Sequence, residues 1–247
     1  MRHKAQIENI SKSNKMEKQR FPKTLALIPD GNRRWARSHK LSMLRGYDLG
    51  IKKFILFSEW CMQYGIDSIA VWAFSTENFS RNDSETKTLF GLYKKVANDK
   101  PIIARLHSNK TRFKVIGNKK MLPSDLRKSL EHLELETMKY KGRIINMLIG
   151  YGGRDDLLHA VKAIAKNVKD VASINEAMIS RYLISNSIPE IDLVIRTSGE
   201  QRLSGFMPWQ TEYSELYFSK KLWPSFTKKD LKAALADYSK RQRRFGK

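Results

Sequence analysis

Short runs of apolar residues alternate with amphipathic stretches along most of the chain. The apolar runs predict buried strands at 25–28, 68–74, 113–117, 144–149, 191–195 and 214–218. The amphipathic stretches predict helices at 50–64, 84–97, 124–140, 155–168, 174–184 and 228–243. Alternation on this scale is typical of a buried, mostly parallel sheet with helices on both faces. We therefore predict an α/β fold, a single domain with a central, mostly parallel sheet of about six strands flanked by helices.

The first 20 residues break this pattern. They are polar, carry more lysine and arginine than acidic residues, and contain no apolar segment of signal-peptide type. We predict a basic N-terminal arm over 1–20, poorly ordered or loosely docked, and one folded domain over 21–247.

Composition narrows the class of protein. A chain of 247 residues that is 41% hydrophobic can bury the core of one large domain. Its single cysteine, Cys61, excludes an internal disulfide and lies in an apolar helical pattern, which predicts a core thiol in a reducing compartment. No stretch approaches the ~18 apolar residues that a membrane-spanning helix needs. These features predict a cytoplasmic protein whose contact with membranes is at most peripheral.

The net charge is strongly positive. With 47 Lys and Arg against 25 Asp and Glu, the formal charge is +22. This charge favours anionic partners without choosing among nucleic acid, anionic lipid and phosphorylated metabolites. Nucleic-acid modules usually interleave basic and exposed aromatic residues, whereas most aromatic residues here fall in apolar runs. We therefore expect no specific nucleic acid and favour attraction to a membrane surface.

A polar cluster follows the first predicted strand, with the sequence Asp30-Gly31-Asn32-Arg33-Arg34. Ligands of open α/β sheets bind where strands end. Gly31 lets the backbone approach a ligand closely, and the amide and guanidinium groups suit a phosphate. A carboxylate such as Asp30 among phosphate ligands makes sense if a hard cation such as Mg²⁺ lies between them. The alternative interpretation is a turn with an Asx cap and solvated arginines.

Three further strand ends carry polar clusters, at 75–81, 151–155 and 196–204. Because the carboxyl ends of parallel strands meet at one edge of a sheet, we expect all four clusters to converge. The cluster at 196–204 combines two arginines and three hydroxyl groups around a glycine, which is suited to an anion. Glu215 lies in an apolar, strand-like segment, where a carboxylate is costly unless it is paired, metal-bound or facing water. The nucleotide-binding patterns GxGxxG and GxxxxGK[ST] are absent after every predicted strand.

These residues belong to longer motifs. The motifs are IPDGNRRWA (28–36), GYDLG (46–50), VWAFSTENFSR (71–81), GYGGR (150–154), DLVIRTSGEQRLSGFMPWQTEYSELYF (192–218), LWPSF (222–226) and RRFG (243–246). In these motifs the chain resembles the cis-prenyltransferases, the undecaprenyl diphosphate synthase-like family, from about residue 21 to the end. The DDxxD metal motif of the trans-type prenyl synthases is absent, which supports the resemblance to the cis type.

The resemblance implies a fold and a reaction. Members of this family have a central, mostly parallel sheet and a hydrophobic tunnel for the growing chain. They condense isopentenyl diphosphate with an allylic prenyl diphosphate, form a product of Z configuration and release diphosphate. They usually act as homodimers with Mg²⁺.

The resemblance also implies roles for residues at matching positions. The metal would be held by Asp30 and by Glu215, the latter from the same subunit or from across the dimer. The catalytic residues would be Asp30, Asn32, Ser75 and Asn78. The allylic diphosphate would be surrounded by Gly31, Asn32, Arg33, Arg34, Trp35, Arg45, Tyr47 and Arg81. Isopentenyl diphosphate would be bound by Arg196, Arg202, Ser204, Arg244 and Gly246, the last two in a C-terminal R-x-G element that reaches the partner's site.

The chain departs from the family pattern beside the first cluster. Tyr47 replaces a histidine of the family, and Met43 stands where some members have an arginine, for which Arg45 is a substitute. Tyrosine can donate a hydrogen bond to phosphate but does not titrate near neutrality, which excludes a catalytic histidine at this place. These departures leave the allylic substrate and regular head-to-tail coupling open. The sequence by itself also leaves the product length and the proton acceptor open.

Two alternative functions stay open at this stage. One is irregular coupling, or prenyl transfer to a different acceptor on the same fold. The other is a non-catalytic partner subunit or nucleic-acid binder, which the presence of both Asp30 and the arginine-rich 196–204 cluster disfavours.

Overall fold

The structure is a computed structural model that describes residues 21–80 and 82–241. The predicted basic arm, 1–20, lies outside the described residues.

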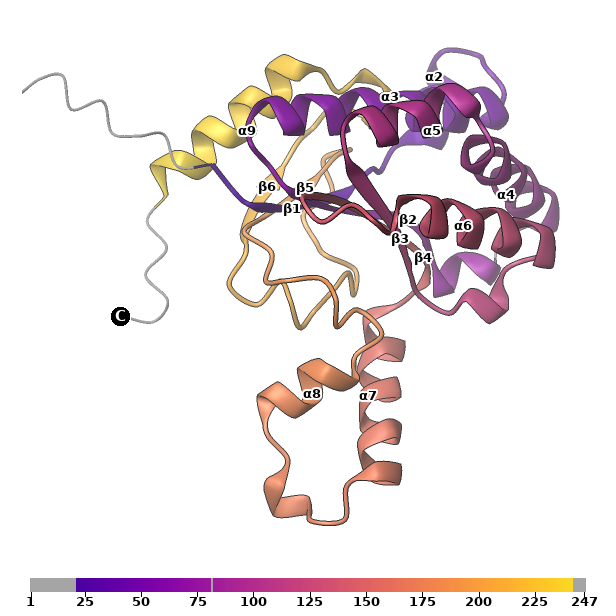
Figure 1. Cartoon of the computed structure of the whole chain (residues 1–247). Helices are drawn as coiled ribbons and strands as arrows, with labels where there is room; N and C mark the ends of the chain where they lie inside the picture. The colour runs from indigo at the N-terminus through magenta and orange to yellow at the C-terminus, as the bar shows by residue number, and fades with distance from the viewer. Residues whose placement is uncertain (1–20, 81, 242–247) are drawn as a thin grey trace, which may run out of the picture.

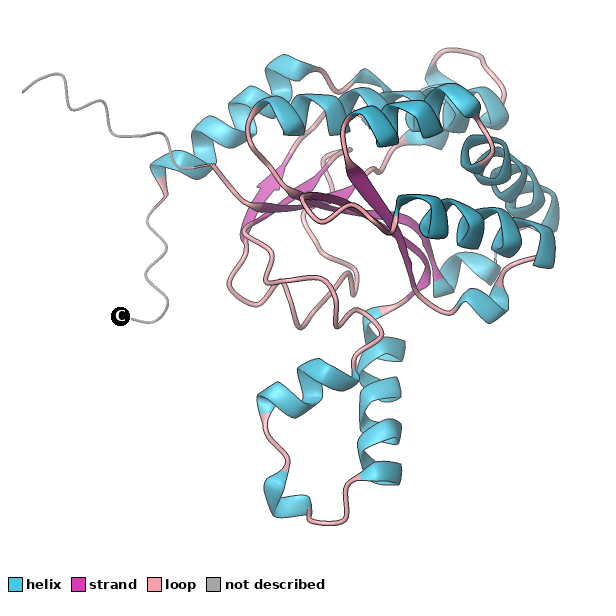
Figure 2. Ribbon diagram, viewed as in Figure 1, coloured by secondary structure: helices cyan, strands magenta, loops and turns pink. Residues whose placement is uncertain are grey.

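A six-stranded sheet forms the centre of the described chain, and all of its neighbouring strands are parallel (Figure 2). The order across the sheet is β3-β4-β2-β1-β5-β6. The strands are β1 (Thr24–Ile28), β2 (Ser68–Ser75), β3 (Thr111–Ile116), β4 (Arg143–Tyr151), β5 (Leu193–Arg196) and β6 (Glu215–Phe218). The six predicted strands are therefore confirmed, with ends that differ by a few residues.

Eight α-helices accompany the sheet in the described ranges. They are α2 (Asn32–Ser38), α3 (Met43–Gln63), α4 (Asp83–Ala97), α5 (Lys100–Ser108), α6 (Ser124–Thr137), α7 (Gly153–Asn167), α8 (Glu176–Tyr182) and α9 (Lys228–Lys240). Two of them, α2 and α5, were not predicted. The start of α5 has recognisable signals, because the Asp99 side chain accepts a hydrogen bond from the Ile102 amide at 3.1 Å and Pro101 lies in the first turn.

Two of the predicted helix starts are corrected by the structure. The helix predicted from residue 50 is α3, which begins seven residues earlier, at Met43. Ser124 is the first residue of α6 rather than its N-cap, which is Pro123, and no side chain caps this end. Proline fixes its own φ but offers no side-chain acceptor for the first amides of the helix.

The two faces of the sheet are covered differently. Figure 1 shows α3, α5, α6 and α9 along one face, while α7 and α8 project away on the opposite side. Under the helices, buried residues of β1 and β5 pack with α3 and α9, and residues of β2 to β4 pack with α4 and α6. On the second face, Ile188, Ile191, Phe206 and Met207 come from segments outside the α-helices and cover β1, β2 and β5.

The strand order changes direction at β1. From β1 the chain continues to β2 on one side, and it later returns to β5 on the other side. In open parallel sheets such a switch point leaves a crevice at the carboxyl ends of the two strands, because their connections run in opposite directions. The crevice lies between residues that follow β1 and the end of β5.

Candidate active site

Asp30 and Arg196 meet in this crevice. Ile28, the last residue of β1, is paired in register with Arg196, the last residue of β5. The Arg196 Nη2 lies 3.1 Å from the Asp30 Oδ2, and the Arg196 side chain is only 6% exposed. Residues from the first and fourth polar clusters, 166 positions apart, are thus joined by an ion pair at the switch point.

The surroundings of Asp30 keep it ionised. Burial acts to raise its pKa, but hydrogen bonds from Arg196 and Ser198 and the positive charges of Arg196 and Arg34 outweigh burial, so the pKa of Asp30 is lowered. A divalent cation requires a deprotonated carboxylate, and the two arginines hold Asp30 in that state.

Arg34 connects the two clusters a second time. Helix α2 begins directly after Gly31, whose φ of 106° is a left-handed conformation that favours glycine. One turn into the helix, Arg34 lies 3.4 Å from the Asp30 carboxylate and donates hydrogen bonds to the Ser198 hydroxyl at 2.6 Å and to Glu200 at 3.1 Å. This arrangement orients the guanidinium across the crevice.

The loop after β5 is tightly curled around Arg196. The Arg196 Nη1 donates to the Ser204 hydroxyl at 3.0 Å and to the backbone oxygen of Arg202. Ser198 and Ser204 have φ values of 83° and 55°, which are strained for residues other than glycine. Strain of this kind persists where the surroundings fix the backbone, and here it turns several polar groups toward one point.

Two polar atoms at the crevice have no hydrogen-bond partner among the described residues. They are the buried Arg196 Nε and the buried Asn32 Oδ1. A buried donor without a partner costs free energy, so the Arg196 Nε is suited to an anionic ligand. The Asn32 Nδ2 donates to the Pro29 carbonyl at 3.0 Å, which fixes the orientation of the amide.

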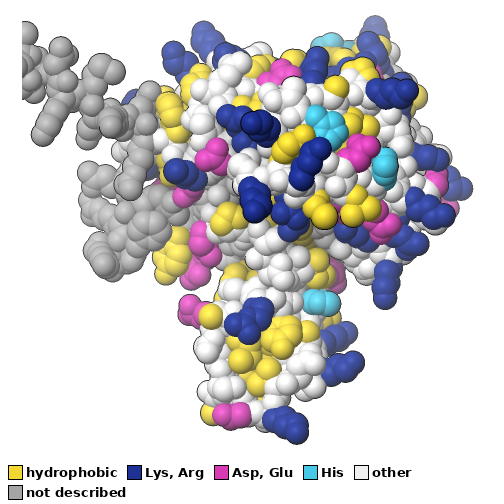
Figure 3. All heavy atoms as spheres, in the orientation of Figure 1, with side chains coloured by type: hydrophobic (Ala, Val, Ile, Leu, Met, Phe, Trp, Pro, Cys, Tyr) yellow, Lys and Arg dark blue, Asp and Glu magenta, His cyan; other side chains and the backbone are white. Residues whose placement is uncertain are grey.

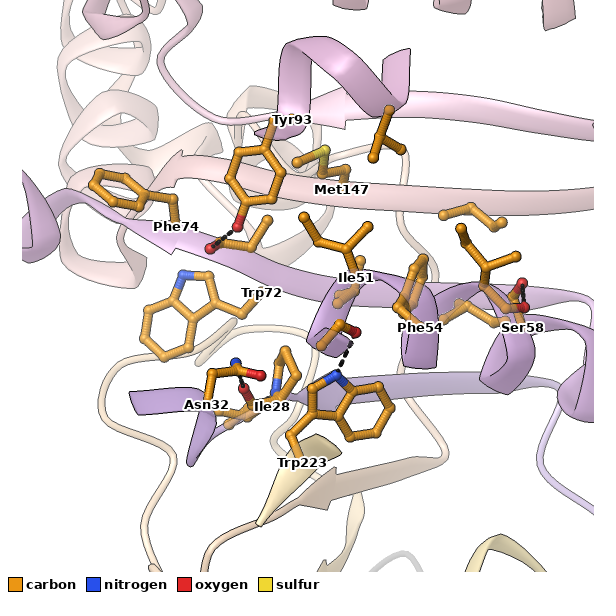
Figure 4. A pocket seen from close by; sticks show the side chains of 18 of the residues that line it. Ile28, Asn32, Ile51, Phe54, Ser58, Trp72, Phe74, Tyr93, Met147 and Trp223 are labelled. Atoms are coloured by element: carbon orange, nitrogen blue, oxygen red, sulfur yellow. Dashed lines mark hydrogen bonds between the residues drawn. The ribbon is translucent and has the colours of Figure 1, made fainter. Parts of the chain in front are cut away.

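A cavity of about 1040 Å³ extends from this crevice beneath the helices. Its polar mouth includes Asp30, Asn32, Arg34, Arg196 and Ser204. Its interior is lined by apolar side chains of α3, α4, α5 and the sheet, among them Ile51, Phe54, Leu89, Ile102, Leu106 and Met147. In Figure 4, Asn32 and Ile28 lie toward one end of the view and Phe54 and Ser58 toward the other. The site therefore combines a charged mouth with an apolar interior.

The second polar cluster contributes to the same mouth. Ser75 and Asn78 both line the cavity, and the Ser75 amide donates to the Asn78 side chain at 3.4 Å. Deeper in the cavity, the strand β2 has irregular register between Trp72 and Ser75, and the Tyr93 hydroxyl donates to the Ala73 carbonyl at 2.6 Å.

Tyr47 lines the cavity but is directed toward an acidic residue. Its hydroxyl donates to the buried Glu85 carboxylate at 2.5 Å, and Arg33 lies 3.6 Å from the same carboxylate. Tyr47 thus contacts Arg33 of the first polar cluster through Glu85.

Some predicted site residues lie elsewhere. Trp35 donates to the Ser225 hydroxyl at 2.8 Å and stacks on His39, and it is not among the residues that line the cavity. Arg45 pairs with Asp48 at 3.1 Å and is likewise outside the lining. Arg81, Arg244 and Gly246 lie outside the described residues.

Glu215 is separated from Asp30 within one chain. It starts β6 in register with Leu193, at the amino end of the parallel strands, whereas Asp30 follows the carboxyl end of β1. Its carboxylate pairs with Arg241 at 2.8 Å. Glu215 and Asp30 of one chain are therefore too far apart to bind the same metal ion.

The third polar cluster, 151–155, does not join the cavity lining either. The Tyr151 hydroxyl donates to the buried Asp156 at 2.9 Å, and Asp156 also accepts from the Ile184 amide and the Ser185 hydroxyl. The expectation that the clusters meet at one edge holds for this one, because Tyr151 is in register with Ser75 and the Gly153 amide donates to the Gly205 carbonyl at 3.0 Å. Its Tyr151 hydroxyl, however, helps fasten α7 to the segment after α8 instead of lining the cavity.

Sequence reasoning missed charged residues of the cavity lining, among them Glu200 and Arg37, and one that lies outside the lining, Glu85. Glu200 bridges Arg34 and Arg202, and Arg202 lies 2.5 Å from it. Glu85 is the buried partner of Arg33, and Arg37 lines the mouth one turn beyond the RR pair. The role of Glu200 could have been predicted from the sequence, since an acidic residue between two arginines indicates ion pairing. The contact of Glu85 with Arg33 could not, because it depends on the packing of α4 against α3.

Comparison with known proteins identifies the family. A prenyltransferase family model for undecaprenyl diphosphate synthases matches residues 28–246. The chain belongs to this family of cis-prenyltransferases. Such an enzyme condenses isopentenyl diphosphate with an allylic prenyl diphosphate and forms a product of Z configuration.

Relatives of this cis-prenyltransferase match it over most of their length. An isoprenyl transferase of Thermus thermophilus is 39% identical, over 92% of this chain and 89% of that protein. A tritrans,polycis-undecaprenyl-diphosphate synthase (geranylgeranyl-diphosphate specific) of Picrophilus torridus is 41% identical, over 94% of this chain and 92% of that protein. The solved structure of lavandulyl diphosphate synthase from Lavandula x intermedia, in complex with dimethylallyl diphosphate, has a TM-score of 0.88 and 34% identity over 92% of this chain and 99% of that one.

The residues at the mouth fit a divalent cation that is shared with a diphosphate. No group of three or more His, Cys, Asp or Glu residues suited to a metal occurs in the described ranges, so no all-protein cage is found there. Mg²⁺ is commonly bound by one or two carboxylates together with phosphate oxygens, which matches an ionised Asp30 beside arginines that suit a diphosphate.

Proposed function

We propose that this cis-prenyltransferase binds an allylic diphosphate at Asp30 and extends it by isopentenyl units into a long polyprenyl diphosphate. The observation that carries the proposal is the continuity of one cavity from the charged mouth into an apolar interior of about 1040 Å³ in total. The diphosphate stays among the arginines, and the prenyl chain fills the apolar part, because transfer of its carbon atoms out of water is favourable.

In this proposal the residues of the mouth divide into two groups. Arg33, Arg34 and Asn32 hold the allylic diphosphate and stabilise the charge that develops on it as the allylic C–O bond breaks. The residues Arg196, Arg202 and Ser204 hold isopentenyl diphosphate with its double bond toward the allylic carbon, which is a positioning task. Ser75 and Asn78 lie beside the reacting carbon atoms.

We further propose that Asp30 holds Mg²⁺ against the allylic diphosphate. When bound, the ion neutralises charge on the diphosphate and favours its departure. Support comes from the lowered pKa of Asp30: burial acts to raise it, but hydrogen bonds from Arg196 and Ser198 and the charges of Arg196 and Arg34 outweigh burial.

Radiolabelled isopentenyl diphosphate, supplied with a panel of allylic diphosphates of increasing length, tests the reaction. We expect lipid-extractable products, which are then sized, and we expect EDTA to abolish them and added Mg²⁺ to restore them. Asp30→Ala is expected to lower turnover by about 100-fold or more, since one preorganised charge at such a site is worth that much. Asp125→Ala, at an exposed carboxylate of α6, is the control.

Near wild-type turnover in Asp30→Ala would contradict the assignment. A second incubation, with radiolabelled dimethylallyl diphosphate and no isopentenyl diphosphate, tests the alternative of irregular coupling or transfer to another acceptor, which is favoured by the similarity to a synthase solved with dimethylallyl diphosphate. A product formed from dimethylallyl diphosphate alone, without isopentenyl diphosphate, would support that alternative.

We propose that the active form is a homodimer that uses the α7–α8 projection. Leu158 and Val161, one turn apart on α7, are 50% and 60% exposed, and Val171 in the following segment is 74% exposed. Figure 3 shows hydrophobic side chains gathered on the projecting part of the molecule. Such groups on a protruding pair of helices are typical of contact with a partner. The separation of Glu215 from Asp30 adds support, because a metal ligand at Glu215 would have to act on a second chain.

We also propose peripheral contact between the cavity mouth and an anionic membrane. The turn from α2 to α3 exposes apolar side chains beside basic ones, namely Leu41, Met43 and Leu44 with Arg37, Lys40 and Arg45. Met43 and Arg37 also line the cavity, so a lipid product leaving it would meet the membrane there. No helix in the described ranges is long and apolar enough to cross a bilayer. Co-sedimentation with vesicles tests the contact. Binding that does not depend on the anionic lipid content of the vesicles would contradict it.

A further inference from the structure

The far end of the cavity is polar. All strands are parallel, and the diphosphate residues follow their carboxyl ends, so the amino ends of β2, β3 and β4 lie at the opposite end. There the lining includes Glu59, Asp67, Arg105, Asn109 and Arg143. An apolar chain that grows along the sheet from Asp30 therefore meets charged groups after the apolar interior.

An ion pair joins two walls of the cavity at this end. Glu59 on α3 and Arg105 on α5 are in contact, with the Arg105 Nη1 2.9 Å from the Glu59 Oε1. The side chains are 32% and 56% exposed, so the pair lies between the cavity and solvent. On the cavity side, its neighbours along the two helices are the apolar Ile55 and Met62 on α3 and Ile102 and Leu106 on α5.

We propose that the Glu59–Arg105 ion pair determines where the growing prenyl chain stops and thereby sets product length. The inference rests on the proposed function of chain extension. Each added unit is favourable while it enters the apolar interior. An isoprene unit that reaches the ion pair must either separate the two side chains or pack against them and exclude water from their charges. Both are costly in free energy.

The structure also supplies a reason to expect that the pair can be changed without unfolding the protein. Half-exposed ion pairs contribute little to stability. Glu59 and Arg105 belong to the distal part of the cavity and not to the diphosphate-binding clusters, so their substitution leaves the charged mouth intact.

The test compares product lengths from labelled isopentenyl diphosphate and the best allylic diphosphate. We expect Glu59→Ala, Arg105→Ala and Arg105→Met each to lengthen the main product by at least one isoprene unit. Arg105→Met removes the charge while keeping most of the side-chain volume, so it separates an effect of charge on product length from an effect of volume. The double exchange Glu59→Arg with Arg105→Glu is expected to restore the wild-type length.

Lys94→Met and Asp125→Ala provide the matched control. These residues form an ion pair of 2.7 Å between α4 and α6, and neither lines the cavity. We expect wild-type product length from both. Unchanged or shorter products from the Glu59 and Arg105 variants would overturn the inference, as would failure of the double exchange, in correctly folded protein by circular dichroism, to restore the length.

The rate of the first condensation separates this inference from the proposed function. It is expected to stay within about twofold of wild type in all these variants, because distant sites act independently. A wild-type protein that extends no allylic diphosphate would refute the proposed function. A wild-type protein that extends normally, with lengths insensitive to Glu59 and Arg105, would refute only the role of the pair.

Discussion

The buried contact between Tyr47 and Glu85 shows how a single residue departs from its family pattern. Where the family has a histidine, the Tyr47 hydroxyl donates to a carboxylate that also pairs with Arg33. A phenol is a neutral donor over the physiological pH range, so this contact does not change with protonation as an imidazole contact would. Tyr47 is therefore expected to act as a positioning residue for Arg33.

Tyr47→Phe tests this role. Loss of one donor to a buried carboxylate is expected to lower the free energy of unfolding by about 1–3 kcal/mol. The KM for the allylic diphosphate should rise more than kcat falls, because the position of Arg33 is altered while the remaining site stays intact. Steady-state kinetics and urea unfolding provide both measurements. Tyr64→Phe is the control, since Tyr64 packs on the core beside Phe21 and does not line the cavity. An unchanged KM in Tyr47→Phe would exclude the positioning role.

At the scale of elements, close packing of α2 on α3 fixes the orientation of Asn32. Gly46 and Gly50 lie one turn apart on α3 and face α2. A Cβ at Gly46 would lie 2.7 Å from the Asn32 carbonyl oxygen, and a Cβ at Gly50 would lie 2.2 Å from the Asn32 Oδ1. The glycine-framed GYDLG motif thus has a physical reason, because any side chain at these positions would push α2 away.

Gly50→Ala is expected to impair catalysis through Asn32. The added methyl group should lower the free energy of unfolding by roughly 1–3 kcal/mol as the packing adjusts. It should also reduce kcat/KM, because the Asn32 amide must move from the mouth of the cavity. Gly91→Ala in α4 is the matched control, since a Cβ there meets nothing within 4 Å. That control should be stabilising by about 0.5–1 kcal/mol, as expected for Gly→Ala within a helix. Normal kinetics in Gly50→Ala would contradict the proposed constraint.

At the scale of the whole molecule, two of the exposed apolar regions among the described residues have different expected partners. The α2–α3 turn lies at the cavity mouth and is basic, which suits a membrane, whereas the α7–α8 projection stands away from the body (Figure 1). The network around Asp156 holds the start of α7 to the segment after α8, so the projection has a fixed base. A rigid, apolar projection is suited to a second copy of the chain.

Leu158→Glu is expected to convert the proposed dimer into monomers. A charge buried at an interface without a partner is strongly unfavourable. Sedimentation velocity measures the change, and activity should fall in parallel if Glu215 or the C-terminal element acts across the dimer. Leu135→Glu is a matched control, because Leu135 on α6 is 65% exposed and lies outside the projection. A Leu158→Glu protein that sediments as wild type would place the interface elsewhere.

The structural features predicted best are those that depend on residues close together in the sequence. All six strands were found because a sheet buried on both faces requires continuous apolar runs, as in the fully buried β1. The helix α2 was missed because its sequence, NRRWARS, is short and mostly polar, with Ala36 as its one buried residue. Its helical form depends on contact with the glycines of α3.

The sequence by itself determined the α/β class, the apolar strands and the chemistry of the clusters at 30–34 and 196–204. These follow from local side-chain properties, which do not depend on where the chain goes next. Only the tertiary structure decided that Asp30 forms an ion pair with Arg196, that the third cluster stays outside the cavity lining, and that Glu215 lies at the opposite end of the sheet. The reason is the strand order, because the switch at β1 places β5 beside β1. That order is stabilised by packing between residues far apart in the sequence, which local patterns do not reveal.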